Sequence, residues 1–251
     1  MLGKVVLVTG GTRGVGKGIA DAFASAGARV VVCGRSAPTP DAGSEPSTAL
    51  FKQADIRDPE QSAALLHGIV AEFGHLDIVV NNAGGSPPAD SATASPRFLE
   101  AIVRLNLIAP LEICQVANEA MQTQQSGGVI INISSLNGIR PSPGTAAYGA
   151  AKAGIIEATA SLAAVYAPKV RINCVTPGAI ESPELHSLYG GDSYFEAVAA
   201  TVPMGRMGRP SDVASACLFL ASEAAEFITG SNLVVHGGGD KATDIGVTSS
   251  R

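Results

Sequence analysis

The stretch VVLVTGGTRGVG, from Val5 to Gly16, decides the fold of this chain. It joins a short β-branched run to a glycine-rich turn, and a helical pattern begins at Lys17. Glycines at positions 10, 14 and 16 let the backbone turn tightly and approach a pyrophosphate, which then lies against the amide groups and the positive end of the helix. In this order of strand, turn and helix, the glycines favour a dinucleotide site over a plain structural turn.

The same turn nearly matches a second phosphate-binding pattern, the P-loop GxxxxGK[ST], over Gly11–Gly18. The last position of that pattern is Gly18, which has no hydroxyl to hold magnesium. The run LDIVV (Leu76–Val80) also leads into Asn81-Asn82 and not into a magnesium-binding acid. Both departures argue against the P-loop.

Short β-branched runs alternate with helical patterns along the whole chain. Strands that are apolar on both faces and separated by helices indicate a parallel sheet covered on both sides. We therefore predict a doubly wound, Rossmann-like α/β domain with about seven parallel strands flanked by helices. The predicted strands are Val5–Thr9, Arg29–Cys33, Leu50–Gln53, Leu76–Val80, Gly128–Ser134, Val170–Val175 and Asn232–His236, and the helices lie at about 17–27, 58–74, 97–125, 145–167 and 210–222.

Two segments interrupt this alternation. Ser36–Thr48 contains three prolines and no apolar periodicity, which predicts a loop where a helix is expected. Residues 182–203 combine a proline, a glycine pair and an aromatic cluster, and we interpret them as a lid with a short helix. Residues 240–251 are small and polar, and we expect disorder there. With no sign of a second domain, we predict one domain over residues 1–251.

Composition excludes several classes of protein. The 251 residues are 46% hydrophobic and carry a net charge of −5, which argues against a disordered chain and against a nucleic-acid partner. No apolar run is long enough to span a membrane, and a strand starts too close to Met1 for a signal peptide, so we expect a cytoplasmic protein without a membrane partner. The cysteines and histidines show no metal-ligand spacing, so we expect no metal.

Charge at the end of the second strand indicates which dinucleotide binds. NAD sites usually place an acid there, whereas a 2′-phosphate requires cations. The strand ends at Gly34-Arg35, with no acid before Asp41, and Arg13 projects from the glycine turn toward the same region. Either arginine alone can be a solvated surface residue, but together they favour NADP(H) over NAD(H).

A serine, a tyrosine and a lysine form the candidate catalytic group. Ser135 follows the fifth strand, Tyr148 comes thirteen residues later, and Lys152 lies one helical turn beyond it on the same face. A nearby ammonium lowers the pKa of a phenol from its ordinary value of about 10, so that the phenol can exchange a proton with a carbonyl oxygen. Ser135 would hydrogen-bond to that oxygen. An ordinary amphipathic helix surface is the alternative, and the glycine turn makes it the weaker one.

These motifs resemble the small, single-domain short-chain dehydrogenase/reductase family, in particular its NADP-dependent β-ketoacyl and carbonyl reductases. The resemblance extends from about residue 4 to 238 and includes N-N-A-G at Asn81–Gly84 and L-N-L around Asn106. It implies four catalytic residues: Asn106, Ser135, Tyr148 and Lys152. It implies a cofactor site made of Gly10, Thr12, Arg13, Gly14, Val15, Gly16, Arg35, Asp55, Ile56, Asn82, Ala83, Gly84, Tyr148, Lys152, Pro177, Gly178, Ile180 and Ser182.

The resemblance also implies individual roles. Asp55 would contact the adenine ring, Lys152 would hold the nicotinamide ribose, and Asn106 would anchor a water chain to Lys152. Departures from the family pattern are Ser182, where threonine is usual, and His236, where aspartate often precedes the last glycines. The family also implies a homotetramer formed through the helices at 97–125 and 145–167.

The substrate pocket is expected between residues 85–90, 136–144 and the lid. Its one charged side chain near Ser135 is Arg140, which either recognises an acidic or phosphorylated group or, as the sequence favours, points to solvent. The main hypothesis is an NADP(H)-dependent oxidoreductase acting on a small-molecule carbonyl or secondary alcohol. A non-catalytic NADP(H)-binding regulatory protein remains open, as does an epimerase or dehydratase on the same scaffold.

Overall fold

Seven parallel strands form the centre of the molecule. The computed structural model describes residues 1–37, 48–181 and 192–239, and within them the sheet order is β3-β2-β1-β4-β5-β6-β7. This order confirms the predicted doubly wound, Rossmann-like fold. The strands are β1 (Val5–Thr9), β2 (Arg29–Gly34), β3 (Leu50–Gln53), β4 (Ile78–Asn81), β5 (Gly128–Ile133), β6 (Val170–Pro177) and β7 (Asn232–Val235).

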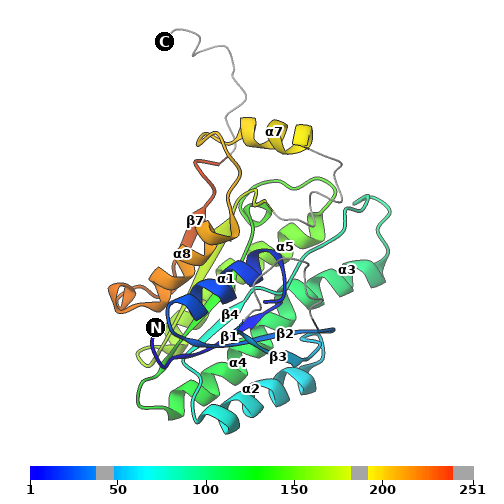
Figure 1. The fold of residues 1–251 in the computed structure, drawn as a ribbon. Coiled ribbons are helices and arrows are strands. Elements are labelled where there is room, and N and C mark those ends of the chain that lie inside the picture. The colour runs from blue at the N-terminus through cyan, green and yellow to red at the C-terminus, as the bar shows by residue number, and fades with distance from the viewer. Residues whose placement is uncertain (38–47, 182–191, 240–251) are drawn as a thin grey trace.

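Helices cover both faces of the sheet (Figure 1). Strand β1 shows why, because Val5 and Leu7 pack into one hydrophobic cluster and Val6 and Val8 into the other, as the two-residue period of a strand requires. Helices α2 (Pro59–Phe73), α4 (Ala109–Thr123) and α5 (Ala146–Tyr166) contribute to the first cluster, and α1 (Gly14–Ser25) and α8 (Pro210–Ala221) to the second.

Strand order reverses next to β1, and this places the site. The chain runs from β1 outward through β2 to β3, and then returns to pair β4 with the other side of β1. In open α/β sheets a crevice forms at such a switch point, outside the carboxyl ends of the strands. The glycine turn and the segment after β4 therefore meet at one edge of the sheet.

The helix predicted over 97–125 is not one regular α-helix. It consists of α3 (Pro96–Val103), a π-helix (Arg104–Ile108) and α4 in direct succession. Asn106 lies within the π-helix, where the wider turn has no counterpart in the apolar periodicity that predicted a helix. The short helix expected in the lid is α7 (Asp192–Thr201).

The fourth strand starts later than predicted, at Ile78 instead of Leu76. For Leu76 the reason is a side chain, since Gln124 accepts a hydrogen bond from Leu76 N at 2.8 Å and donates one to Leu76 O at 3.1 Å. Those two backbone groups are thus paired with an amide instead of with a neighbouring strand.

Residues 38–47, 182–191 and 240–251 lie outside the described part of the chain. The proline-rich loop, the first half of the lid, Ser182 and the disordered tail therefore stay predictions, as does the single domain over 1–251. No helix within residues 1–37, 48–181 and 192–239 is long and apolar enough to cross a membrane.

Candidate active site

The glycine turn after β1 has the shape of an anion cradle. Gly10 and Gly14 have φ values of +62° and +51°, in the region that favours glycine. A Cβ on Gly16 would lie 2.3 Å from Gly10 O and 2.4 Å from Asn82 Nδ2. The N-cap residue Arg13 makes no side-chain cap hydrogen bond, and the first turn of α1 holds no acidic residue. The start of α1 therefore suits a phosphate by shape and by dipole.

Side-chain hydrogen bonds join this turn to the segment after β4. The Thr9 hydroxyl accepts from the backbone N–H groups of Asn82 and Ala83, each at 3.0 Å, and lies 3.4 Å from Val80 O. In return, Asn82 Nδ2 donates to Thr9 O at 3.0 Å and to Gly10 O at 3.3 Å. The predicted Gly10–Gly16 and Asn82–Gly84 segments thus form one wall of the crevice.

The end of β2 lies beside the glycine turn. A Cβ on Gly34 would lie 3.9 Å from the Thr12 methyl group. Arg13 and Arg35 directly follow Thr12 and Gly34 in the chain, and both are exposed. Gln53 Nε2 donates to Arg35 O at 2.9 Å, which fixes the backbone of Arg35 against β3. The structure thus brings the two predicted 2′-phosphate arginines to one edge of the sheet.

Asp55, the predicted adenine contact, is already paired. Arg57 Nε donates to its two carboxylate oxygens at 2.9 and 3.1 Å, and these hydrogen bonds lower the pKa of Asp55. Arg57 was missed from the sequence, although its position two residues after an acid is a signal for such a pair. Ile56, next to it, is buried.

Ser135 and Tyr148 meet at the end of β5. Ser135 caps a short 3₁₀ turn (Leu136–Gly138), and its Oγ accepts from Asn137 N at 3.2 Å. This contact leaves the Ser135 hydroxyl proton available for donation. Tyr148 is close enough for the Ser135 side chain to lower the pKa of its phenol.

Lys152 lies next to the Tyr148 ring. Its side chain is buried, and Nζ lies 5.7 Å from the centre of the Tyr148 ring. Nζ also donates to Ile133 O at 2.8 Å. The predicted grouping of Ser135, Tyr148 and Lys152 is therefore present in the fold.

Electrostatics at these residues differ from the prediction. Burial raises the pKa of Tyr148, and the Ser135 side chain offsets this only in part. The expectation that Lys152 holds the pKa of Tyr148 below its ordinary value is therefore wrong in this structure, because loss of solvation dominates. Burial also lowers the pKa of Lys152 to about 8, so the amine is mostly protonated at neutral pH.

Asn106 and Gly84 pack around Lys152. Asn106 Oδ1 accepts from Gly85 N at 2.8 Å, and its Nδ2 donates to Gly85 O and to Ile102 O, both at 2.9 Å. A Cβ on Gly84 would lie 2.7 Å from Asn106 Oδ1 and 3.1 Å from Lys152 Nζ. Only glycine fits between these two side chains. The water chain predicted for Asn106 stays a prediction.

Three further predicted cofactor contacts lie at the end of β6 or just after it. Pro177 ends the strand, and a Cβ on the next residue, Gly178, would lie 2.8 Å from His236 Cβ. Ile180 is buried and forms a β-bridge with Gly208. These residues close the carboxyl edge on the β7 side.

Gly18 has a structural explanation. A Cβ on it would lie 2.4 Å from Pro210 Cβ at the start of α8, so close packing of α1 against α8 requires a glycine where the P-loop requires a hydroxyl. Within residues 1–37, 48–181 and 192–239, no group of three metal-ligating side chains could hold a metal ion. The cysteines at positions 33, 114, 174 and 217 are free and buried.

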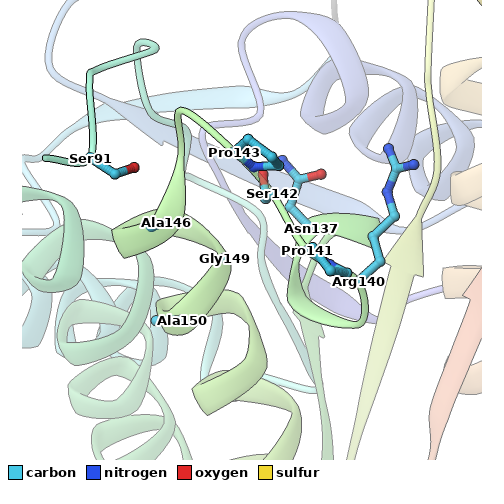
Figure 2. Close-up of a pocket in the computed structure, with 9 residues that line it drawn as sticks. All are labelled: Ser91, Asn137, Arg140, Pro141, Ser142, Pro143, Ala146, Gly149 and Ala150. Carbon is cyan, nitrogen blue, oxygen red and sulfur yellow. The ribbon is translucent and has the colours of Figure 1, made fainter.

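A groove of about 390 Å³ lies between the segment after β5 and the start of α5 (Figure 2). A smaller hollow of about 40 Å³, lined by Tyr148, shares Ser91 and Ala146 with it. Among the residues that the structure describes, Arg140 is the only charged side chain lining either one. Figure 2 shows Arg140 extending away from α5, so its two interpretations stay open.

The hollow next to Tyr148 was only partly predicted. The expected segments 85–90 and 136–144 contribute to its walls, and they are tied together by a hydrogen bond from Ala89 N to Gly144 O at 2.9 Å. The sequence missed Phe98 and Leu99, which reach it from α3. Both lie within the helix predicted over 97–125, and no local pattern distinguishes a pocket wall from another face of a helix.

Known proteins are similar to this chain in fold and sequence. A family model described as Enoyl-(Acyl carrier protein) reductase matches residues 10–240. The chain is 36% identical over 245 residues to a 3-oxoacyl-(acyl-carrier-protein) reductase of Chlamydia muridarum, covering 95% of this chain and 98% of the relative. It is 40% identical over 246 residues to an L-fucose dehydrogenase of Oryctolagus cuniculus, covering 95% and 85%. A ligand-free aldohexose dehydrogenase of Thermoplasma acidophilum has a similar solved structure, with a TM-score of 0.88, 30% identity, and coverage of 99% of this chain and 97% of that chain.

Proposed function

Because the chain belongs to the short-chain dehydrogenase/reductase family, we propose that it is an NADP(H)-dependent oxidoreductase that interconverts a carbonyl group and a secondary alcohol. The observation that carries this proposal is the grouping of Ser135, Tyr148 and Lys152 beside the glycine turn. A dinucleotide bound there would supply or accept the hydride. The chain's own residues would transfer the proton and stabilise the charge that develops on the substrate oxygen.

In the reductive direction, Tyr148 gives its hydroxyl proton to the carbonyl oxygen. The raised pKa of Tyr148 keeps the phenol protonated at neutral pH, which suits a proton donor. Ser135 donates its hydroxyl proton in a hydrogen bond to the same oxygen, because its own Oγ already accepts from Asn137 N. The buried Lys152 ammonium stabilises the phenolate that remains.

Specificity for the 2′-phosphate is assigned to Arg13 and Arg35. Both are exposed at the edge where β2 ends beside the turn. A guanidinium group can donate two parallel hydrogen bonds to the oxygens of one phosphate. Family members use NAD(H) or NADP(H), and the lack of an acid over Gly34–Ala37 supports NADP(H).

A panel of carbonyl compounds, followed by NADPH absorbance with NADH in parallel, tests this proposal. We expect turnover with NADPH and weaker turnover with NADH. Preference for NADH would overturn the assignment of Arg13 and Arg35. Tight NADPH binding with no turnover on the panel would contradict the oxidoreductase and favour the non-catalytic regulatory protein.

Substrate, assembly and location complete the proposal. One relative is named as a reductase of a 3-oxoacyl-(acyl-carrier-protein) and another as a dehydrogenase of L-fucose, so the substrate class stays a small-molecule carbonyl or alcohol. We propose a homotetramer through the helices at 97–125 and 145–167. Exposed positions on α5 include the small residues Ala153, Ala160 and Ala164. Size-exclusion elution as a monomer would contradict it. The cytoplasmic location stays a prediction.

A further inference from the structure

Lys152 is held at both ends by two consecutive residues of one strand end. Its Nζ donates to Ile133 O at 2.8 Å. Its backbone carbonyl accepts from the Ser134 hydroxyl, also at 2.8 Å. Ser134 is 4% exposed and Lys152 is 3% exposed, so both contacts lie in a low-dielectric environment where hydrogen bonds are strong.

The bond from Ser134 is additional to the helix's own pairing. In an α-helix the carbonyl of one residue accepts from the N–H four residues later, and a carbonyl oxygen has a second lone pair for another donor. Ser134 uses that second position on Lys152. Its own backbone N–H donates to Val175 O on β6 at 2.8 Å, so Ser134 links α5 to the centre of the sheet.

The 3₁₀ turn after Ser135 packs on the same point of α5. A Cβ on Gly138 would lie 2.7 Å from the Lys152 carbonyl carbon and 2.9 Å from Ala153 N. The turn therefore presses against the helix where Ser134 binds it. Ser134, Ser135 and the 3₁₀ turn follow one another directly in the chain. Loss of the hydrogen bond from Ser134 to the Lys152 carbonyl therefore moves Lys152 relative to Ser135.

We propose that Ser134 is a positioning residue, which fixes the backbone of Lys152 and so places its ammonium under Tyr148 and Gly84. The expected effect of this positioning on turnover rests on the proposed function. Tyr148 on α5 and Cys174 on β6 are the titratable groups that act on or lie over the Lys152 ammonium among the described residues. Neither supplies the hydrogen bond that holds the lysine backbone.

Ser134→Ala tests the proposal, with Ser62→Ala as its matched control. Ser62 is also buried, and its hydroxyl donates to Ile56 O at 3.2 Å, on α2 and away from Lys152. Both variants lose one buried bond from a hydroxyl to a backbone carbonyl, so both should unfold at a lower temperature. Only Ser134→Ala should let water reach Lys152 and raise its titration midpoint toward the ordinary value, as measured by nitrogen NMR of labelled lysine.

Turnover is the second measurement. Ser134→Ala should lower kcat on the order of fivefold, the size expected of one neutral hydrogen bond, and should shift the alkaline limb of the pH profile. Ser134→Thr keeps the hydroxyl and should restore both values. A wild-type lysine midpoint and pH profile in Ser134→Ala, with only stability reduced, would overturn the positioning role.

If Ser134→Ala does not fold, Ser134→Cys retains a weaker donor and should give an intermediate lysine midpoint. A wild-type midpoint in that variant would also overturn the proposal. The lysine titration needs no substrate, so its failure is distinguishable from the absence of carbonyl reduction in the wild-type protein.

Discussion

At the carboxyl ends of β1 and β4, one threonine hydroxyl binds two backbone amides, and glycines leave no room for side chains. At the end of β5, Ser135, Tyr148 and Lys152 are instead placed by a strand end, a 3₁₀ turn and a long helix. The first region can select a ligand by its shape and by its backbone hydrogen-bond donors. The second can carry out proton transfer through buried ionisable groups, whose pKa values depend on packing. A substitution in the first should therefore affect binding, and one in the second should affect chemistry.

The largest effect is expected in the second region, from Tyr148→Phe. Loss of the phenol proton should lower kcat by about a hundredfold to ten-thousandfold, the usual contribution of a general acid. NADPH should still bind, as measured by its fluorescence. A kcat within tenfold of wild type would contradict the role of Tyr148.

Tyr166→Phe is the matched control on the same helix. Tyr166 is buried, and its hydroxyl has no hydrogen-bond partner within the described structure. Removing an unsatisfied buried hydroxyl should leave kcat unchanged and should preserve or raise thermal stability. Equal losses of activity in both variants would show that the effect of Tyr148→Phe arises from packing.

The first region is tested by Gly16→Ala. Its new methyl group would lie 2.3 Å from the backbone oxygen of Gly10, so the turn must shift, at a cost of about 1–3 kcal/mol. NADPH affinity should fall by at least about tenfold. Gly68→Ala, on α2, is the control, since nothing lies within 4 Å of its new Cβ and the change should stabilise the helix by about 0.5–1 kcal/mol. Calorimetric titration and thermal unfolding measure both.

Cofactor choice should respond to the two exposed arginines of the same region. Replacing Arg13 and Arg35 by Gln removes two charge-assisted contacts to a 2′-phosphate and should raise the KM for NADPH by about tenfold to a hundredfold. The KM for NADH should change little. Arg29→Gln, an exposed arginine at the opposite end of β2, should leave both constants as they are. An equal rise in KM for NADH and NADPH would show that the arginines stabilise the glycine turn and do not bind the 2′-phosphate.

The same contrast explains how much the sequence could predict. The glycine turn, the strands and the spacing of Tyr148 and Lys152 are local patterns, and each recurs in the structure. The direction of the Tyr148 pKa shift depends on how deeply the ring is buried, which no spacing encodes. The π-helix at Asn106 and the Gln124 contact that delays β4 also arise from packing between distant segments.

Lys152 should make the stability of the fold depend on pH. Its pKa is lowered to about 8 in the fold, against an ordinary value of 10.5, so between these values the unfolded chain binds more protons than the folded one. Below about pH 8 the buried ammonium therefore costs stability, and that cost falls as pH rises, by at most about 1.4 kcal/mol per pH unit. Lys152→Met removes the charge, so its gain in unfolding free energy over wild type should be largest near pH 7 and should shrink by pH 10. Urea unfolding at several pH values measures the difference in unfolding free energy between the variant and wild type. The buried cysteines titrate in both proteins, so their contribution cancels in this difference. A gain independent of pH would contradict a lowered pKa for Lys152, and with it the view that burial, more than any charged neighbour, sets the chemistry at the end of β5.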